Sequence, residues 1–151
     1  DCNEWLEFRR VLFRSWILER TLVLIKPDAV ERNLIGKILT FYEDNGLKII
    51  ALKMEKISRE FAEKHYKEHK GKSFFNELID YITRSSLCAL VLEGNDAVEK
   101  VREINGSTKP EKQKEGTIRK AYAKSITENS VHSSDSVEHA KEEIELWFPS
   151  L

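Results

Sequence analysis

The order of apolar and polar segments predicts an α+β sandwich, in which a four-stranded antiparallel sheet carries helices packed on one face. Short runs rich in β-branched residues alternate with longer segments whose apolar residues recur every three or four positions. Glycine, asparagine and serine separate these segments where turns and helix caps are needed. From residue 19 the order is β-α-β-α-α-β-α-loop-β-α, for which the ferredoxin-like βαββαβ arrangement is the natural candidate.

The strands are expected at residues 21–25, 47–57 and 87–93, with a short edge strand within 118–126. The first of these is short, apolar and β-branched, and Lys26-Pro27-Asp28 ends it. A continuous apolar run of this length is typical of a central strand that is buried on both faces.

The helices are expected at residues 34–42, 58–69, 75–82, 98–104 and 137–147. Asn45-Gly46 stops the first helix, Ser58 caps the second, and Asp135-x-x-Glu138 resembles a capping box before the last. Residues 105–116 contain no aliphatic or aromatic side chain and are therefore expected to form a surface loop.

Composition excludes several classes of protein. The 25 basic and 26 acidic side chains give a formal net charge of −1, so a protein dedicated to binding nucleic acid is not expected. The longest apolar run, residues 87–92, is far shorter than the roughly 18 residues that cross a bilayer, so no membrane association is expected. Cys2 and Cys88 have no metal-type spacing, and Cys88 lies in this apolar run. A buried thiol in a reducing, cytoplasmic compartment is predicted.

Residues 1–18 differ from the rest of the chain. They are dense in aromatic residues and arginine, without a turn signal or a clean period. No apolar segment follows the arginines as it would in a signal peptide. We therefore divide the chain into an extension, residues 1–18, and one domain, residues 19–151. A functional arm and a scar of gene prediction or cloning both fit the extension.

The histidines are the first candidates for chemistry. His65 and His69 lie four residues apart, which suits a metal, but no third ligand accompanies them and an ordinary helix surface is the favoured interpretation. His132 lies among hydroxyl-bearing residues just before a predicted helix. The N-terminus of a helix attracts anions, so a histidine there is well placed to meet a phosphate, although a loop histidine without a task fits as well.

The long loop supports a phosphate site. Residues 109–124 hold six basic side chains against two acidic ones, and Arg102 precedes them on a predicted helix. A charge run is usually a solvated face, but Arg119 lies beside a glycine, and two guanidiniums with a histidine suit phosphoryl transfer. Neither a Walker motif nor GxGxxG is present, which excludes P-loop and Rossmann enzymes.

Three strings occur in a fixed order: Ile25-Lys26-Pro27-Asp28-Ala29-Val30, then Gly116-Thr117-Ile118-Arg119, then Asn129-x-x-His132-x-Ser134-Asp135-Ser136. Together they resemble the nucleoside diphosphate kinase family over about residues 19–148. The resemblance implies the ferredoxin-like fold and a Mg²⁺-dependent, ping-pong transfer of the γ-phosphate from a nucleoside triphosphate such as ATP to a diphosphate. It also implies a phosphohistidine intermediate and a homo-oligomer, tetramer or hexamer.

The resemblance also implies roles for particular residues. His132 would be the nucleophile at Nδ1, Glu143 would orient its ring, and Tyr66 and Ser134 would flank it. The phosphates and the ribose would be held by Arg102, Thr108, Arg119, Lys26 and Asn129. Phe74 and Ile126 would sandwich the base, and a slot that stacks without reading base edges accepts every base.

Several loop residues depart from the family pattern. They are Lys72-Ser73 before Phe74, Ser85-Ser86-Leu87, Lys109, Lys120 and Ser133. None of them is a transferred site residue, so the departures concern loop conformation and contacts between subunits.

Two alternatives come from other classes. One is a non-catalytic module of the same fold that binds nucleotides or a partner. Loss of the histidine or of an arginine would favour it, and all are present. The other is a ferredoxin-like RNA-binding domain, which needs aromatic residues on two central strands. Residues 21–25 and 87–92 offer aliphatic residues instead.

Overall fold

The computed structural model describes residues 18–151. The strands are β1 (Leu18–Ile25), β2 (Lys48–Glu55), β3 (Leu87–Asn95) and β4 (Val131–Ser133). The α-helices are α2 (Pro27–Glu31), α3 (Ile35–Asp44), α4 (Arg59–His65), α5 (Phe75–Thr83), α6 (Ala97–Asn105), α7 (Ile118–Tyr122) and α8 (Val137–Trp147). Two short 3₁₀ helices, η1 (Lys67–His69) and η2 (Pro110–Lys112), lie in the connections.

The strands form one antiparallel sheet in the order β2-β3-β1-β4, which confirms the ferredoxin-like arrangement. β1 is a central strand. Leu24 lies opposite Ala89 of β3 on one side and opposite His132 of β4 on the other. The strand predicted from its apolar run therefore positions the candidate nucleophile.

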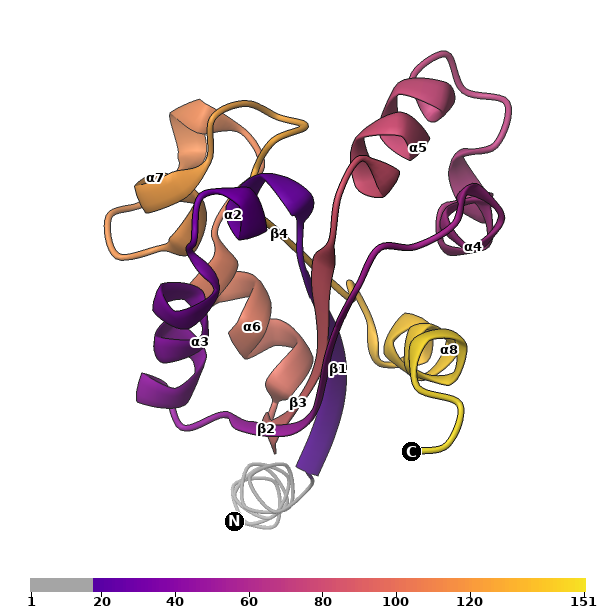
Figure 1. Ribbon diagram of the computed structural model, residues 1–151. Coiled ribbons are helices and arrows are strands. Elements are labelled where there is room, and N and C mark those ends of the chain that lie inside the picture. Colours follow the sequence, from indigo (N-terminus) through magenta and orange to yellow (C-terminus); the bar gives the residue numbers. More distant parts are fainter. Residues whose placement is uncertain (1–17) are drawn as a thin grey trace, which may run out of the picture.

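Helices cover both faces of this sheet (Figure 1). On one face Val23 and Ile25 pack with residues of α3 and α6, and on the other Leu22 and Leu24 pack with residues of α4, α5 and α8. All four of these β1 side chains are fully buried. The prediction that β1 is buried on both faces is confirmed. The expectation of helices on one face is wrong, because a strand without a polar side needs cover on both.

The predicted edge strand within residues 118–126 is also wrong. Residues 118–122 form α7, since the Thr117 hydroxyl accepts a hydrogen bond from the Lys120 N–H and caps a helix there. The edge strand is β4 instead. With three residues it is too short to show an alternating pattern.

Smaller corrections concern the ends of elements. α4 stops at His65, so the single helix expected to reach His69 is divided into α4 and η1. Ser136, not Asp135, caps α8. The Ser136 hydroxyl accepts a hydrogen bond from the His139 N–H, while the Asp135 carboxylate pairs with the His139 ring.

β1 begins at Leu18, one residue inside the expected extension, and residues 1–17 lie outside the described part of the chain. Within residues 18–151, no helix has the length and apolar character that a bilayer crossing requires.

The buried pair Tyr42–Asn105 gives a test of the packing between α3 and α6. The Tyr42 hydroxyl donates to Asn105 Oδ1 at 2.6 Å, and both residues are fully buried. We expect Tyr42→Phe to lower the free energy of unfolding by about 1–3 kcal/mol, because the Asn105 oxygen loses its partner where water cannot replace it. Denaturant unfolding measures this loss.

Tyr122→Phe is the matched control, since the Tyr122 side chain is half-buried and its hydroxyl makes no hydrogen bond within residues 18–151. Equal effects of the two substitutions would show that the Tyr42–Asn105 bond contributes nothing of its own.

Candidate active site

His132 is the centre of the site. It occupies the middle of β4, and its side chain is 24% exposed. Two hollows of about 1150 and 1170 Å³ meet at this residue, and both are lined by His132, Ser133 and Asp135. The histidine is therefore accessible from two sides while its backbone is held in the sheet.

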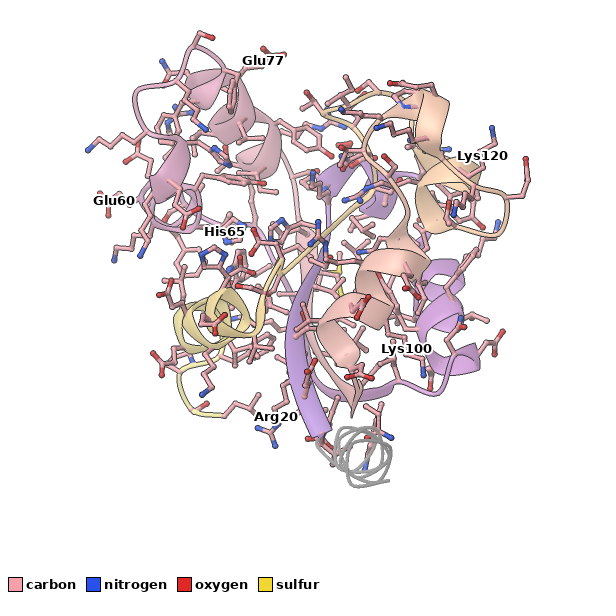
Figure 2. The ribbon with its side chains drawn as sticks, turned by 180° about the vertical axis from the view of Figure 1, so that it is seen from behind. Arg20, Glu60, His65, Glu77, Lys100 and Lys120 are labelled. Carbon is pink, nitrogen blue, oxygen red and sulfur yellow. The ribbon has the colours of Figure 1, made fainter. Side chains whose placement is uncertain are left out.

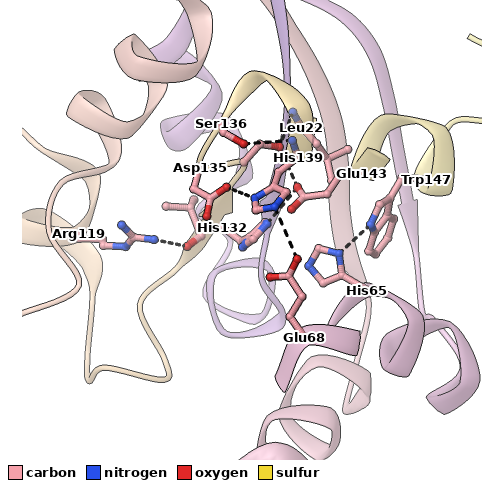
Figure 3. Close-up of polar contacts among 12 residues, drawn as sticks. Leu22, His65, Glu68, Arg119, His132, Asp135, Ser136, His139, Glu143 and Trp147 are labelled. Carbon is pink, nitrogen blue, oxygen red and sulfur yellow. Dashed lines mark hydrogen bonds and ion pairs between the residues drawn. The ribbon is translucent and has the colours of Figure 1, made fainter. Parts of the chain in front are cut away.

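Glu143 and Ser134 hold one side of the His132 ring (Figure 3). His132 Nε2 lies 3.3 Å from Glu143 Oε2, and the Ser134 hydroxyl donates to the same oxygen at 2.8 Å. Ser134 is in turn held by β1, because its N–H donates to the Leu22 carbonyl at 3.2 Å. A carboxylate at Nε2 favours the tautomer with the proton on that nitrogen, which leaves the Nδ1 lone pair free.

Three of the predicted phosphate-binding residues, Arg102, Thr108 and Arg119, line the same hollow as His132. The Arg119 guanidinium donates to the carbonyls of Gly106 at 2.6 Å and Val131 at 2.8 Å, so it is fixed in place. Burial lowers the pKa of Arg119, and the neighbouring Arg102 charge lowers it further, whereas Tyr42 opposes this. The site thus concentrates positive charge beside the nucleophile.

Gly106, whose carbonyl accepts a hydrogen bond from Arg119, occupies a position that only glycine can fill. Its φ is +86°, and a Cβ there would approach Thr117 Oγ1 to 2.7 Å. Only glycine combines this backbone conformation with so close an approach. The sequence signal for this position is the glycine directly after α6.

Lys26 and Asn129 come together from distant parts of the chain. Lys26 Nζ donates to Asn129 Oδ1 at 2.8 Å, and the Lys26 N–H donates to the Ser130 carbonyl at 2.9 Å. Burial lowers the pKa of Lys26 to about 8, and the positive charge of Arg119 adds to this effect while Asp28 opposes it. A phosphate group placed near this ammonium would restore its usual affinity for protons.

The sequence did not predict the polar contacts that surround Lys26 and connect its segment to α5. The Tyr81 hydroxyl donates to the buried Asp28 carboxylate, and Lys26 Nζ lies 5.9 Å from the centroid of the Tyr81 ring. Arg84 bonds Glu31 through two nitrogens at 2.9 Å each and Glu128 at 2.7 Å. These contacts tie α2 and the end of α5 to the segment that carries Asn129. No local signal marks them, because the partners lie 44 and 53 residues apart.

The structure corrects the interpretation of His65. The residue does not lie on an ordinary helix surface: its ring centroid is 4.9 Å from that of His132, and Trp147 Nε1 donates to His65 Nδ1 at 3.2 Å. Figure 2 shows His65 directed between α4 and α8, whereas Glu60 of the same helix points outward. Among residues 18–151, no group of three or more histidine, cysteine or acidic side chains is placed to hold a metal ion.

Tyr66, Phe74 and Ile126 are the remaining predicted site residues, and the structure, which describes all three, shows no direct hydrogen bond between them and His132. Tyr66 is buried and lines the hollow of about 1150 Å³ together with His132 and Glu143. Phe74 and Ile126 are 45% and 67% exposed and lie outside the lining of both hollows. Phe74 lies beside the ring of His69, with centroids 5.5 Å apart. His132 thus shares its hollows with Arg102, Thr108, Arg119, Tyr66 and Glu143, but not with Phe74 or Ile126.

Comparison with known proteins gives a consistent result. The family model described as "Nucleoside diphosphate kinase" matches residues 19–151. A nucleoside diphosphate kinase of Clostridium perfringens is 66% identical over 134 residues, which are 89% of this chain and 94% of the relative. One from Saccharolobus islandicus is 51% identical over 132 residues, 87% of this chain and 96% of the relative.

Solved structures agree with the sequence relatives. The nucleoside diphosphate kinase of Aquifex aeolicus superposes with a TM-score of 0.84 at 40% identity, over 87% of this chain and 96% of that one. The enzyme of Encephalitozoon cuniculi superposes with a TM-score of 0.83 at 40% identity, over 86% and 88% of the two chains. Since the family model spans the whole of the described domain from residue 19 and the relatives share its length, the chain belongs to the nucleoside diphosphate kinase family.

Proposed function

We propose that this chain is a nucleoside diphosphate kinase that moves the γ-phosphate of a nucleoside triphosphate such as ATP to a nucleoside diphosphate through a phosphohistidine at His132. The observation that carries the proposal is the placement of His132. Its Nε2 faces Glu143, and it shares a hollow with Arg102, Thr108 and Arg119. A nucleophile beside donors that match phosphate oxygens is the arrangement that phosphoryl transfer needs.

The reaction has two half-steps. His132 keeps its proton on Nε2, where it donates a hydrogen bond to Glu143, and attacks the γ-phosphorus with the Nδ1 lone pair. The Nδ1–P bond forms as the P–O bond to the β-phosphate breaks, and the electron pair leaves on the β-phosphate oxygen. A second diphosphate then attacks the same phosphorus, and the electron pair of the Nδ1–P bond returns to the imidazole.

The cationic side chains stabilise the charge that shifts during both steps. Arg119 is held by two carbonyls and cannot move away, so it needs little reorganisation when the phosphate arrives. Lys26 and Asn129 would bind the ribose and adjacent phosphate oxygens, and Tyr66 would flank the histidine. Ser134 keeps Glu143 in place through their shared hydrogen bond.

Mg²⁺ would enter with the nucleotide. The hollow that His132 shares with Arg102, Thr108 and Arg119 offers donors to phosphate oxygens at these positions, and such residues suit the phosphates of the nucleotide better than the metal. Bound with the nucleotide, the ion would neutralise part of the phosphate charge.

The base would lie between Phe74 and Ile126. Both are exposed apolar side chains on separate segments, and neither offers a hydrogen bond to a base edge from its side chain. Such contacts support transfer to purine and pyrimidine diphosphates alike.

We further propose a homo-oligomer, tetramer or hexamer, for the complete assembly. β2 lies at the edge of the sheet, and it exposes Leu52 and Met54 by 51% and 57%. An uncovered apolar edge strand is suited to pairing with another chain. Residues 1–17 hold no transferred site residue and are proposed to lie outside the catalytic domain, whereas Leu18 already belongs to β1. The buried, free thiol of Cys88 is compatible with a reducing, cytoplasmic compartment.

The phosphohistidine is tested with His132→Ala. Incubation of the wild-type chain with γ-labelled ATP should give an acid-labile, alkali-stable phosphoenzyme, and the variant should give none while still binding ATP. The reason is that no other group replaces the Nδ1 lone pair. His139→Ala is the control and should label normally, because His139 pairs with Asp135 and Glu68 instead. Label that persists in His132→Ala would assign the carrier to another residue.

The base slot is tested with Phe74→Ala. Loss of stacking should raise KM for purine and pyrimidine diphosphates alike. The increase should correspond to a loss of binding free energy of about 1–3 kcal/mol, the range known for base stacking. Steady-state kinetics with four different diphosphates measures this. A loss confined to one base would indicate that Phe74 takes part in base recognition and would contradict a slot that only stacks.

The lowered pKa of Lys26 predicts that the activity of the free enzyme falls at alkaline pH. Its ammonium is charged below its pKa of about 8 and loses its proton above it, so kcat/KM should fall as pH rises through about 8. Bound phosphate raises this pKa, so the same limit in kcat should lie at higher pH. Lys26→Arg, which stays charged, should lose the limit. If the pH profile of Lys26→Arg matched that of the wild type, the alkaline fall in kcat/KM would belong to another group.

A further inference from the structure

The ring of His65 lies against the candidate nucleophile. The centroids of the His65 and His132 rings are 4.9 Å apart, and their planes are nearly perpendicular at 80°. His65 comes from the last residue of α4, which is on the opposite side of His132 from Arg119 in Figure 3. None of the roles assigned above uses this residue.

Trp147 holds His65 in position. Trp147 is fully buried at the end of α8, and its indole N–H donates to His65 Nδ1 at 3.2 Å. Phe61 packs edge-on against the same indole, with centroids 4.7 Å apart. Glu143 lies one helical turn before Trp147, so α8 contacts His132 directly through Glu143 and indirectly through Trp147 and His65.

We infer that His65 is a positioning residue for phosphoryl transfer, an imidazole anchored by Trp147 that restrains the plane of the His132 ring. This inference rests on the proposed function of His132. The contact with Glu143 fixes one ring nitrogen at 3.3 Å but leaves the ring free to turn about that contact. A second ring packed at 80° against the first removes this freedom and keeps the Nδ1 lone pair in one direction.

The protonation of His65 suits this role. Burial lowers the pKa of His65 well below its ordinary value, and the neighbouring His132, Lys26 and His69 lower it further. Because His65 Nδ1 accepts from Trp147, the neutral ring carries its proton on Nε2. A neutral ring adds no charge beside the phosphate, whereas a cation there would alter the reactivity of His132.

The cost of this arrangement supports a functional reason. His65 Nε2 is buried and has no hydrogen-bond partner within residues 18–151. A buried N–H without a partner is destabilising, and an apolar side chain of similar shape would avoid this loss. The histidine therefore costs stability at the place where it touches the nucleophile.

The experiment compares His65→Ala, His65→Phe and the control Lys141→Ala in the full chain. Lys141 is exposed on α8 and lines neither of the two hollows that meet at His132. Rapid-quench measurement of phosphoenzyme formation should show a rate about 10²-fold lower in His65→Ala with little change in ATP affinity. His65→Phe keeps a ring against His132 and should recover most of the rate. Lys141→Ala should match the wild type.

A second measurement needs no nucleotide. In His65→Ala, ¹³C relaxation of the His132 ring carbons should report a lower order parameter than in the wild type, and His65→Phe should restore it. Thermal unfolding of each variant confirms that the fold persists. If the wild-type chain formed no phosphoenzyme, the proposed function would fail, but the ring relaxation would still test the positioning role.

Two results would overturn the inference. One is phosphorylation of His65→Ala at the wild-type rate. The other is an unchanged order parameter for the His132 ring in that variant, whatever the rate of labelling.

Discussion

β1 pairs with β3 over eight residues and with β4 over three, and it is buried on both faces from Leu22 to Ile25. The short pairing with β4 places His132 opposite Leu24 and lets Ser134 bond to Leu22. Because β1 has no room to move between two layers of helices, the residues paired to it are held with the same rigidity. The position of the candidate nucleophile thus depends on the burial of a strand that has no polar side chain of its own between Leu22 and Ile25.

The residues around His132 are not arranged for stability. Lys26 is buried and Arg119 is half-buried, and this burial lowers the pKa of both. A neighbouring positive charge lowers each pKa further, and Asp28 offsets only part of this effect at Lys26. Like charges held together destabilise the unliganded protein, and a bound phosphate would relieve this repulsion. The unpaired Nε2 of His65 adds a further unfavourable group at the same place. Several destabilising groups gathered in one place are characteristic of a functional site.

Support for the site comes from outside the residues that would contact the nucleotide. Ser134 orients Glu143, two carbonyls orient Arg119, and Arg84 joins the segments that flank Asn129. α8 contributes both Glu143 and Trp147, so one helix controls two contacts to the His132 region. A shift of α8 against β1 would therefore move Glu143 and Trp147 together relative to His132.

The sequence by itself determined the class of fold and the central strand, and it predicted Arg102, Arg119 and His132 as residues of a phosphate site. Those features are local, because apolar runs, caps and charge clusters are read from neighbouring residues. The family resemblance added Lys26, Thr108, Asn129, Ser134, Glu143 and Tyr66 as predicted site residues. In the structure Glu143 contacts His132, and Tyr66 lines a hollow together with it. The edge strand was placed in the wrong segment, because three residues carry no periodic signal.

Only the tertiary structure decided that His65 lies against the candidate nucleophile and that helices cover both sides of the sheet. Trp147 and His65 are 82 residues apart, and their hydrogen bond forms only when α8 and α4 pack on the same face. A helical pattern gives the side of a helix that is buried but not what it is buried against. For that reason His65 looked like a surface residue in the sequence, whereas in the fold its ring lies against that of His132, the candidate nucleophile.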